Sequence, residues 1–117
     1  MDVVSLTLLS SYNFYHILWM MPNERFVIDY AASKGGLTGM MNLSTRLAEY
    51  NISVNDVAPA MIGSTGMISS TMVMDDMVAK IPLRRLGTPE ETANAITMLV
   101  TTGYMTGQSL LLAGGLR

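Results

Sequence analysis

The sequence lacks several residue types on which common classes of protein function depend. It contains no cysteine, so a disulfide framework and a cysteine-based metal site are both excluded. Its single histidine, His16, has no second histidine with which to share a metal ion. Charged residues make up only 14% of the chain, and the net charge is −2. Because no basic stripe is present to neutralise phosphates, the composition argues against a nucleic-acid partner.

The chain also lacks a clear signal peptide or membrane span, although its first residues are apolar. Residues 3–21 are largely hydrophobic, but polar side chains such as Asn13 and His16 interrupt a span of about 20 residues. Asp2 stands where a signal peptide carries positive charge, and no small-residue cleavage motif follows. We therefore expect a cytoplasmic protein without a membrane partner. A small membrane-associated protein is the competing hypothesis, which solubility without detergent would test.

The remaining composition is that of one packed domain. The chain has 117 residues, half of them hydrophobic, which is enough for a single core. Residues 3–9 predict a buried strand, residues 10–13 its turn and residues 22–25 a loop. The twelve methionines are typical of side chains that fill gaps in a core.

The most informative stretch is a predicted helix over residues 30–50. Tyr30 and Lys34 lie four residues apart, which places them on one face of a helix. A nearby ammonium stabilises a phenolate and makes a phenol a usable general acid or base. The spacing alone is weak evidence, because such pairs also occur by chance on exposed helices. Tyr30 and Lys34 are therefore candidate catalytic residues that need support from the rest of the chain.

Three glycines, Gly35, Gly36 and Gly39, fall within this predicted helix. Each destabilises a helix by up to ~1 kcal/mol relative to alanine. They indicate close approach of another backbone or a ligand, or else simply a poor helix. Asn51 is the expected C-terminal cap.

Strand and helix patterns alternate after residue 51. Residues 52–58 predict a short strand that Pro59 ends, and residues 109–113 predict a final strand. Residues 60–66, rich in Gly, Ser and Thr, would follow the carboxyl end of the first of these strands, where open α/β sheets bind ligands. A solvated connection is the alternative. Residues 67–80 predict one or two short helices that serve as a mobile lid or lie on the surface.

Thr88, Pro89 and Glu91 predict the start of the next helix. Threonine at the cap, proline at the first helical position and glutamate three residues after the threonine form a capping box. We interpret this motif as structural, and we expect Gly103 to end the helix. The expected buried stripe of the helix consists of Ala93, Ile96, Leu99 and Val100.

Four motifs, taken together, closely resemble the short-chain dehydrogenase/reductase family, and in particular its 3-oxoacyl-reductase type of ketoreductase. They occur in the family's order between residues 29 and 117. The motifs are YAASKGGL at 30–37, SVNDVAP at 53–59, IPLRRLGTPEE at 81–91 and TGQSLLLAGG at 106–115.

This resemblance implies a fold, an activity and a set of site residues. The fold would be the C-terminal portion of a doubly wound Rossmann-like parallel sheet with flanking helices. The activity would be NAD(P)-dependent reduction of a carbonyl, or oxidation of an alcohol, with NADP the expected cofactor and NAD not excluded. Tyr30 would act as general acid or base and also contact the cofactor, and Lys34 would ease its proton transfer and bind the nicotinamide ribose. The loop against the nicotinamide would be formed by Pro59, Ile62, Ser64 and Thr65.

The resemblance also implies an oligomer and exposes departures from the family. The helix over residues 30–50 would pack against a second subunit. The family's glycine-rich nucleotide turn has no counterpart in the sequence, and Ala60 and Ala113 replace common family residues. The family's catalytic serine would fall at Ile17, so Ser10 or Ser11 would serve only if the intervening loop carries an insertion.

These departures suggest that the chain consists of two segments, and they leave two possible functions. We expect residues 1–28 to be a divergent apolar segment outside the family sequence, and residues 29–117 to be the C-terminal part of the reductase domain. The chain is then either a carbonyl reductase or a catalytically inactive remnant that docks with an intact homologue through its 30–50 helix.

Overall fold

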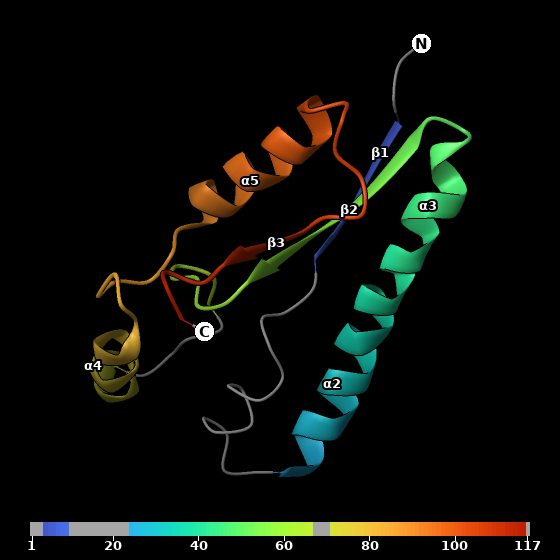
Figure 1. The fold of residues 1–117 in the computed structure, drawn as a ribbon. Helices are drawn as coiled ribbons and strands as arrows, with labels where there is room; N and C mark the ends of the chain where they lie inside the picture. Colours follow the sequence, from blue (N-terminus) through green and yellow to red (C-terminus); the bar gives the residue numbers. More distant parts are fainter. Residues whose placement is uncertain (1–3, 10–23, 67–70, 117) are drawn as a thin grey trace.

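The computed structural model describes residues 4–9, 24–66 and 71–116. In these residues three parallel strands lie in the order β1-β2-β3 (Figure 1). The strands are β1 (Val4–Leu9), β2 (Ile52–Pro59) and β3 (Ser109–Leu112). The α-helices are α2 (Glu24–Gly39), α3 (Leu43–Ala48), α4 (Thr71–Lys80) and α5 (Pro89–Thr101). The predicted α/β class, with a parallel sheet and flanking helices, is confirmed.

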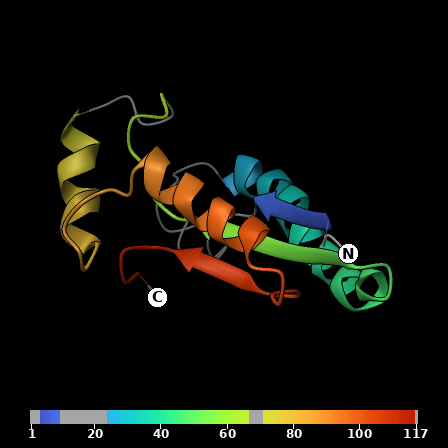
Figure 2. The same ribbon diagram turned by 90° about the horizontal axis from the view of Figure 1, so that it is seen from above.

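Strand β2 is the centre of the sheet. It pairs in parallel with β1 from Val4↔Ile52 onward, and with β3 from Asp56↔Ser109 onward. Helix α5 covers one face of the sheet, whereas α2 and α3 lie on the other (Figures 1 and 2). All six residues from 53 to 58 are buried. A parallel strand covered on both faces buries consecutive residues rather than alternate ones, which explains this pattern.

The hydrophobic core forms where α5 meets the sheet. Val57 of β2 packs with Ala95 and Leu99 of α5, and Leu99 is 0% exposed. The predicted stripe is correct for Leu99 and for Ile96, which packs partly buried against this cluster. It is wrong for Ala93, which is exposed, and for Val100, which is 50% exposed. Ala95 is the buried alanine, because positions four residues apart share a helix face.

The helix that carries Tyr30 differs in extent from its prediction. It begins at Glu24, so Glu24 and Arg25 are helical and the predicted 22–25 loop is wrong for these two residues. The helix is also interrupted, because residues Met40–Asn42 form a tighter 3₁₀ turn before α3. This turn directly follows the three glycines, which weaken the helix. Helix α3 ends at Ala48 with Glu49 as its C-terminal cap, so the cap expected at Asn51 is wrong. Asn51 instead adopts the left-handed conformation, with φ 56°, in the turn that leads to β2.

Buried polar groups of β2 hold the chain that enters β3. The Asn55 side-chain amide donates to the Met105 carbonyl at 2.9 Å, and its oxygen accepts from the Gln108 backbone N–H at 3.1 Å. The Ser109 hydroxyl donates to a buried carboxylate oxygen of Asp56 at 2.7 Å. These side chains therefore fix the entry of β3 against β2.

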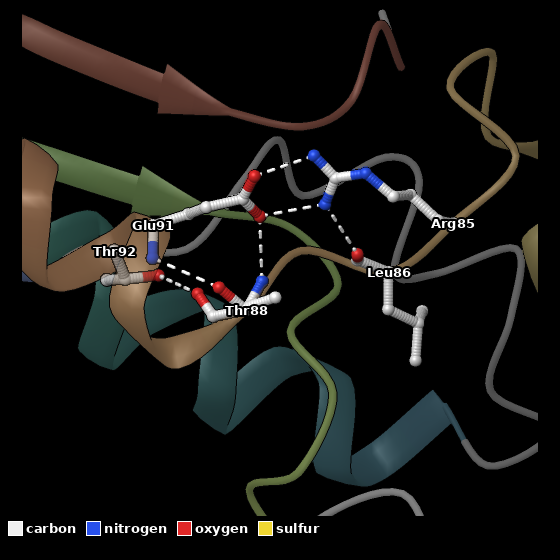
Figure 3. Close-up of polar contacts among 5 residues, drawn as sticks. All are labelled: Arg85, Leu86, Thr88, Glu91 and Thr92. Carbon is white, nitrogen blue, oxygen red and sulfur yellow. Dashed lines mark hydrogen bonds and ion pairs between the residues drawn. The ribbon is translucent and has the colours of Figure 1, made fainter.

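The start of α5 carries the predicted capping box (Figure 3). The Glu91 backbone N–H donates to the Thr88 hydroxyl at 3.1 Å, and the Thr88 backbone N–H donates to Glu91 Oε2 at 2.9 Å. The Arg85 guanidinium also donates to both carboxylate oxygens of Glu91, at 2.6 and 2.9 Å. The hydrogen bonds from Arg85, followed by the one from Thr88, lower the pKa of Glu91 to about 2.

The position of the core predicts different effects for two adjacent residues of α5. Leu99→Ala should lower the free energy of unfolding by about 2–5 kcal/mol, because it removes buried methyl groups and leaves a cavity. Val100→Ala, on the exposed face, should change it by only about 0.5 kcal/mol. Urea denaturation of both variants measures the difference. Equal losses would show that α5 does not bury the face described above.

The lowered pKa of Glu91 predicts how its contribution to stability depends on pH. Its folded-state pKa lies below that of a glutamate in the unfolded chain, which is about 4.3. The stabilisation is therefore complete above that value and is lost as pH falls toward about 2. The melting temperature of the parent should exceed that of Glu91→Gln at about pH 6, and the difference should shrink between about pH 5 and pH 2. Glu90→Gln, which removes a charge from the same helical turn, should show a smaller change, and an equal one would contradict the assignment.

Candidate active site

The structure brings Tyr30 and Lys34 together on α2. The Lys34 ammonium lies 5.9 Å from the centroid of the Tyr30 ring, within the range of a cation–π contact. Tyr30 is 38% exposed and Lys34 is half-buried, so the pair is accessible from solvent. The Ser33 hydroxyl donates to the Tyr30 carbonyl at 2.7 Å within the same turn. The arrangement places a cation beside a phenol that can exchange a proton with a bound molecule.

The predicted ligand loop leaves the carboxyl end of β2 at Pro59. Ile62 forms an isolated parallel bridge with Gly87. In this bridge the Gly63 N–H donates to the Gly87 carbonyl and the Gly87 N–H donates to the Met61 carbonyl, both at 2.9 Å. The loop is thus attached to the segment that precedes α5.

The two hydroxyl residues of this loop lie at the surface. Ser64 is exposed and adopts a left-handed conformation, with φ 58°. Thr65 is exposed as well, and its hydroxyl donates to the Ile62 carbonyl at 3.4 Å. Ser64 and Thr65 therefore present polar groups beyond the carboxyl edge of the sheet, where α/β proteins bind ligands.

The tyrosine–lysine pair and the loop come from different elements but lie toward the same edge of the sheet. Helix α2 runs roughly antiparallel to the strands, so the half that carries Tyr30 lies toward their carboxyl ends (Figure 1). The loop 60–66 leaves from that edge. Ser10, Ser11 and Ile17, the positions considered for a catalytic serine, lie outside the described residues.

Gly87, which is bridged to the candidate ligand loop, was not identified by sequence reasoning. A Cβ at this position would lie 2.6 Å from Ile62 Cδ1 and 3.8 Å from Glu91 Oε2. A side chain there would therefore displace the tip of Ile62, whereas the nearest loop backbone atom, the Met61 oxygen, would lie at 3.6 Å. The only sequence signal was a glycine directly before the capping box, which is compatible with many turns.

A pocket of about 350 Å³ opens beside this bridge. Its walls come from the loop, from the segment before α5 and from the end of β3, and they include the Arg85–Glu91 ion pair. Ile81, which is buried, and Ala113 also line it. Tyr30 and Lys34 are not among its lining residues, so it is distinct from the candidate catalytic pair.

The part of the chain that the structure describes contains neither a cluster of metal ligands nor a membrane-spanning helix. No group of three or more His, Asp or Glu side chains is placed there to hold a metal ion. Nor does any helix in that part combine the length and hydrophobicity that a membrane crossing requires.

Comparisons with known proteins identify the family. The family model described as enoyl-(acyl carrier protein) reductase matches residues 9–117. Carbonyl reductase family member 4 of Danio rerio is 42% identical over 89 residues, which cover 75% of this chain and 37% of that protein. The 3-oxoacyl-(acyl-carrier-protein) reductase FabG of Aggregatibacter actinomycetemcomitans is 37% identical over 96 residues, which cover 80% of this chain and 39% of that protein.

A solved structure agrees with these relatives. The crystal structure of 3-hydroxyacyl-CoA dehydrogenase type-2 from Mycobacterium avium matches 97% of this chain with a TM-score of 0.81 and 32% sequence identity. The match covers 43% of that protein, so this chain spans less than half the length of the relatives compared here. The family model, the related sequences and the shared fold show that the chain belongs to the short-chain dehydrogenase/reductase family of oxidoreductases.

Proposed function

We propose that this chain contributes to NADP-dependent reduction of a carbonyl, or to the reverse oxidation of an alcohol, with Tyr30 as general acid or base. The observation that carries the proposal is the contact between Tyr30 and the Lys34 ammonium on α2. A cation beside a phenol stabilises the phenolate and eases proton transfer in either direction. In reduction Tyr30 donates its proton to the substrate oxygen, and in oxidation it accepts one.

The candidate cofactor loop fits a nicotinamide group. It lies beyond the carboxyl edge of a parallel sheet and exposes the hydroxyl residues Ser64 and Thr65. Pro59 and Ile62 would pack against the ring, the two hydroxyl residues would hold its carboxamide, and Lys34 would bind the ribose. A bound nicotinamide supplies the hydride. NAD is the alternative cofactor, because the family's glycine-rich turn and the selector between the two are absent from the sequence.

The relatives favour a class of substrate. Two of them are named for the reduction of a 3-oxoacyl group or the oxidation of a 3-hydroxyacyl group. We therefore propose a small carbonyl or alcohol substrate of the 3-oxoacyl or 3-hydroxyacyl type. Helix α4 follows the loop in the chain and is the proposed lid over this substrate.

A second proposal is that these residues are inactive alone and dock with another subunit through α2. The three glycines of this helix favour it, because no described atom from outside the neighbouring helix backbone lies within 4 Å of a Cβ built at Gly35, Gly36 or Gly39. The close approach that the glycines indicate is thus not made inside the described part of the chain. The same surface would serve a homo-oligomer or an intact homologue.

A thermal melt with and without NADPH separates the two proposals. A ligand that binds only the folded state raises the melting temperature. A cooperative transition that NADPH shifts upward is expected for a competent cofactor site. A transition that ignores excess NADPH, with no turnover of small ketones, would support the inactive remnant instead.

Tyr30→Phe tests the assigned proton donor. It should lower the turnover of a 3-oxoacyl substrate by about 10²-fold or more, because the contribution of a positioned general acid is lost. The NADPH-induced shift in melting temperature should remain. Tyr104→Phe is the matched control, since Tyr104 is 102% exposed and belongs to the connection between α5 and β3. Unchanged turnover in Tyr30→Phe would remove Tyr30 from the mechanism.

A further inference from the structure

We propose that Arg85 and Glu91 are positioning residues, which hold the candidate ligand loop over residues 60–66 in place through Gly87. The catalytic meaning of this role rests on the proposed cofactor function of the loop, whereas the mechanical role does not. A path of contacts runs from the core through α5 to the loop.

The first step is the firm seating of α5. Ala95 and Leu99 pack against Val57 at the centre of the sheet, and Leu110 and Leu112 of β3 join this cluster. A helix held by core packing carries its first turn in a defined place. Glu91, in that first turn, is therefore attached to the sheet through the helix that bears it.

The second step is the hold of Glu91 on the backbone around Gly87. Glu91 Oε2 accepts from the Thr88 N–H at 2.9 Å, immediately after Gly87. Arg85, bound to both oxygens of Glu91, also donates to the Leu86 carbonyl at 3.1 Å, immediately before Gly87 (Figure 3). The residues on both sides of Gly87 are thus held by one Arg–carboxylate pair with charge-assisted, bidentate geometry.

The third step is the hold of Gly87 on the loop. Its N–H and carbonyl bind Met61 and Gly63, on either side of Ile62. Ser64 and Thr65 follow directly, so their hydroxyls take their position from this bridge. The same bridge also joins the two ends of the segment between Ile62 and Gly87, which contains α4. Moving Gly87 would therefore move the candidate ligand groups and the base of the proposed lid together.

Amide hydrogen exchange on the whole chain tests the proposal with Glu91→Gln. Glutamine at this position retains the capping box but removes the carboxylate that pairs with Arg85. Exchange at the Gly63 and Gly87 amides should become about 10-fold faster. Exchange at the Asp56 and Gly107 amides, which bind Gln108 and Val54 carbonyls within the sheet region, should change much less, because it reports only the small loss of global stability. Glu90→Gln, the matched control on the same turn, should alter neither pair.

The result that would overturn the proposal is equally specific. Unchanged exchange at Gly63 and Gly87 would show that the ion pair does not hold the loop. Equal acceleration at all four amides would show that it supports only global stability. The hydrogen-exchange measurement needs no cofactor. If the chain fails to bind NADPH, the proposed function is refuted, but the exchange rates still test the positioning role.

The cofactor supplies a functional readout for the same path. With NADPH in excess, the upward shift in melting temperature should be smaller in Glu91→Gln than in the parent, and normal in Glu90→Gln. If the parent responds to NADPH and all three proteins respond equally, the loop position does not govern cofactor binding and that part of the proposal falls.

Discussion

The burial of β2 between two layers of helices is the constraint on which the rest of the structure depends. Its residues 53–58 are all buried, and one face receives Ala95 and Leu99 of α5. This packing orients α5, and α5 in turn orients its first turn. The loop that follows β2 is bridged to Gly87, just before that first turn. The same core therefore sets the position of the loop where it leaves β2 and where it meets Gly87.

Local signals were sufficient where a structure depends on neighbours in the chain. Thr88, Pro89 and Glu91 predicted the start of α5 because a capping box is closed within four residues. The helical spacing of Tyr30 and Lys34 likewise predicted their contact. The fold class followed from the alternation of strands and helices, and the family from four motifs in their usual order. The boundary at residue 28 and the role of each site residue remain predictions.

Local signals failed where the answer depends on contacts distant in sequence. Helix α5 is apolar on several sides, so periodicity alone could not choose between Ala93 and Ala95 as its buried alanine. Only packing against Val57 decides. The bridge from Ile62 to Gly87 spans a whole helix, and neither residue signals the other in the sequence. The sequence likewise did not predict the 3₁₀ turn after Gly39. Glycine lowers the stability of an α-helix but does not determine which backbone conformation forms in its place.

The exposure of the Arg85–Glu91 pair decides what kind of role it can have. Both side chains are about half exposed, and exposed ion pairs contribute little to global stability. A weak contribution to the whole fold can still govern a segment whose own stability is small, as ligand loops usually are. Glu91 reaches such a segment through two flanking backbone groups and a glycine that leaves no side chain in between. Its effect is therefore expected in the position of the loop far more than in the unfolding of the domain.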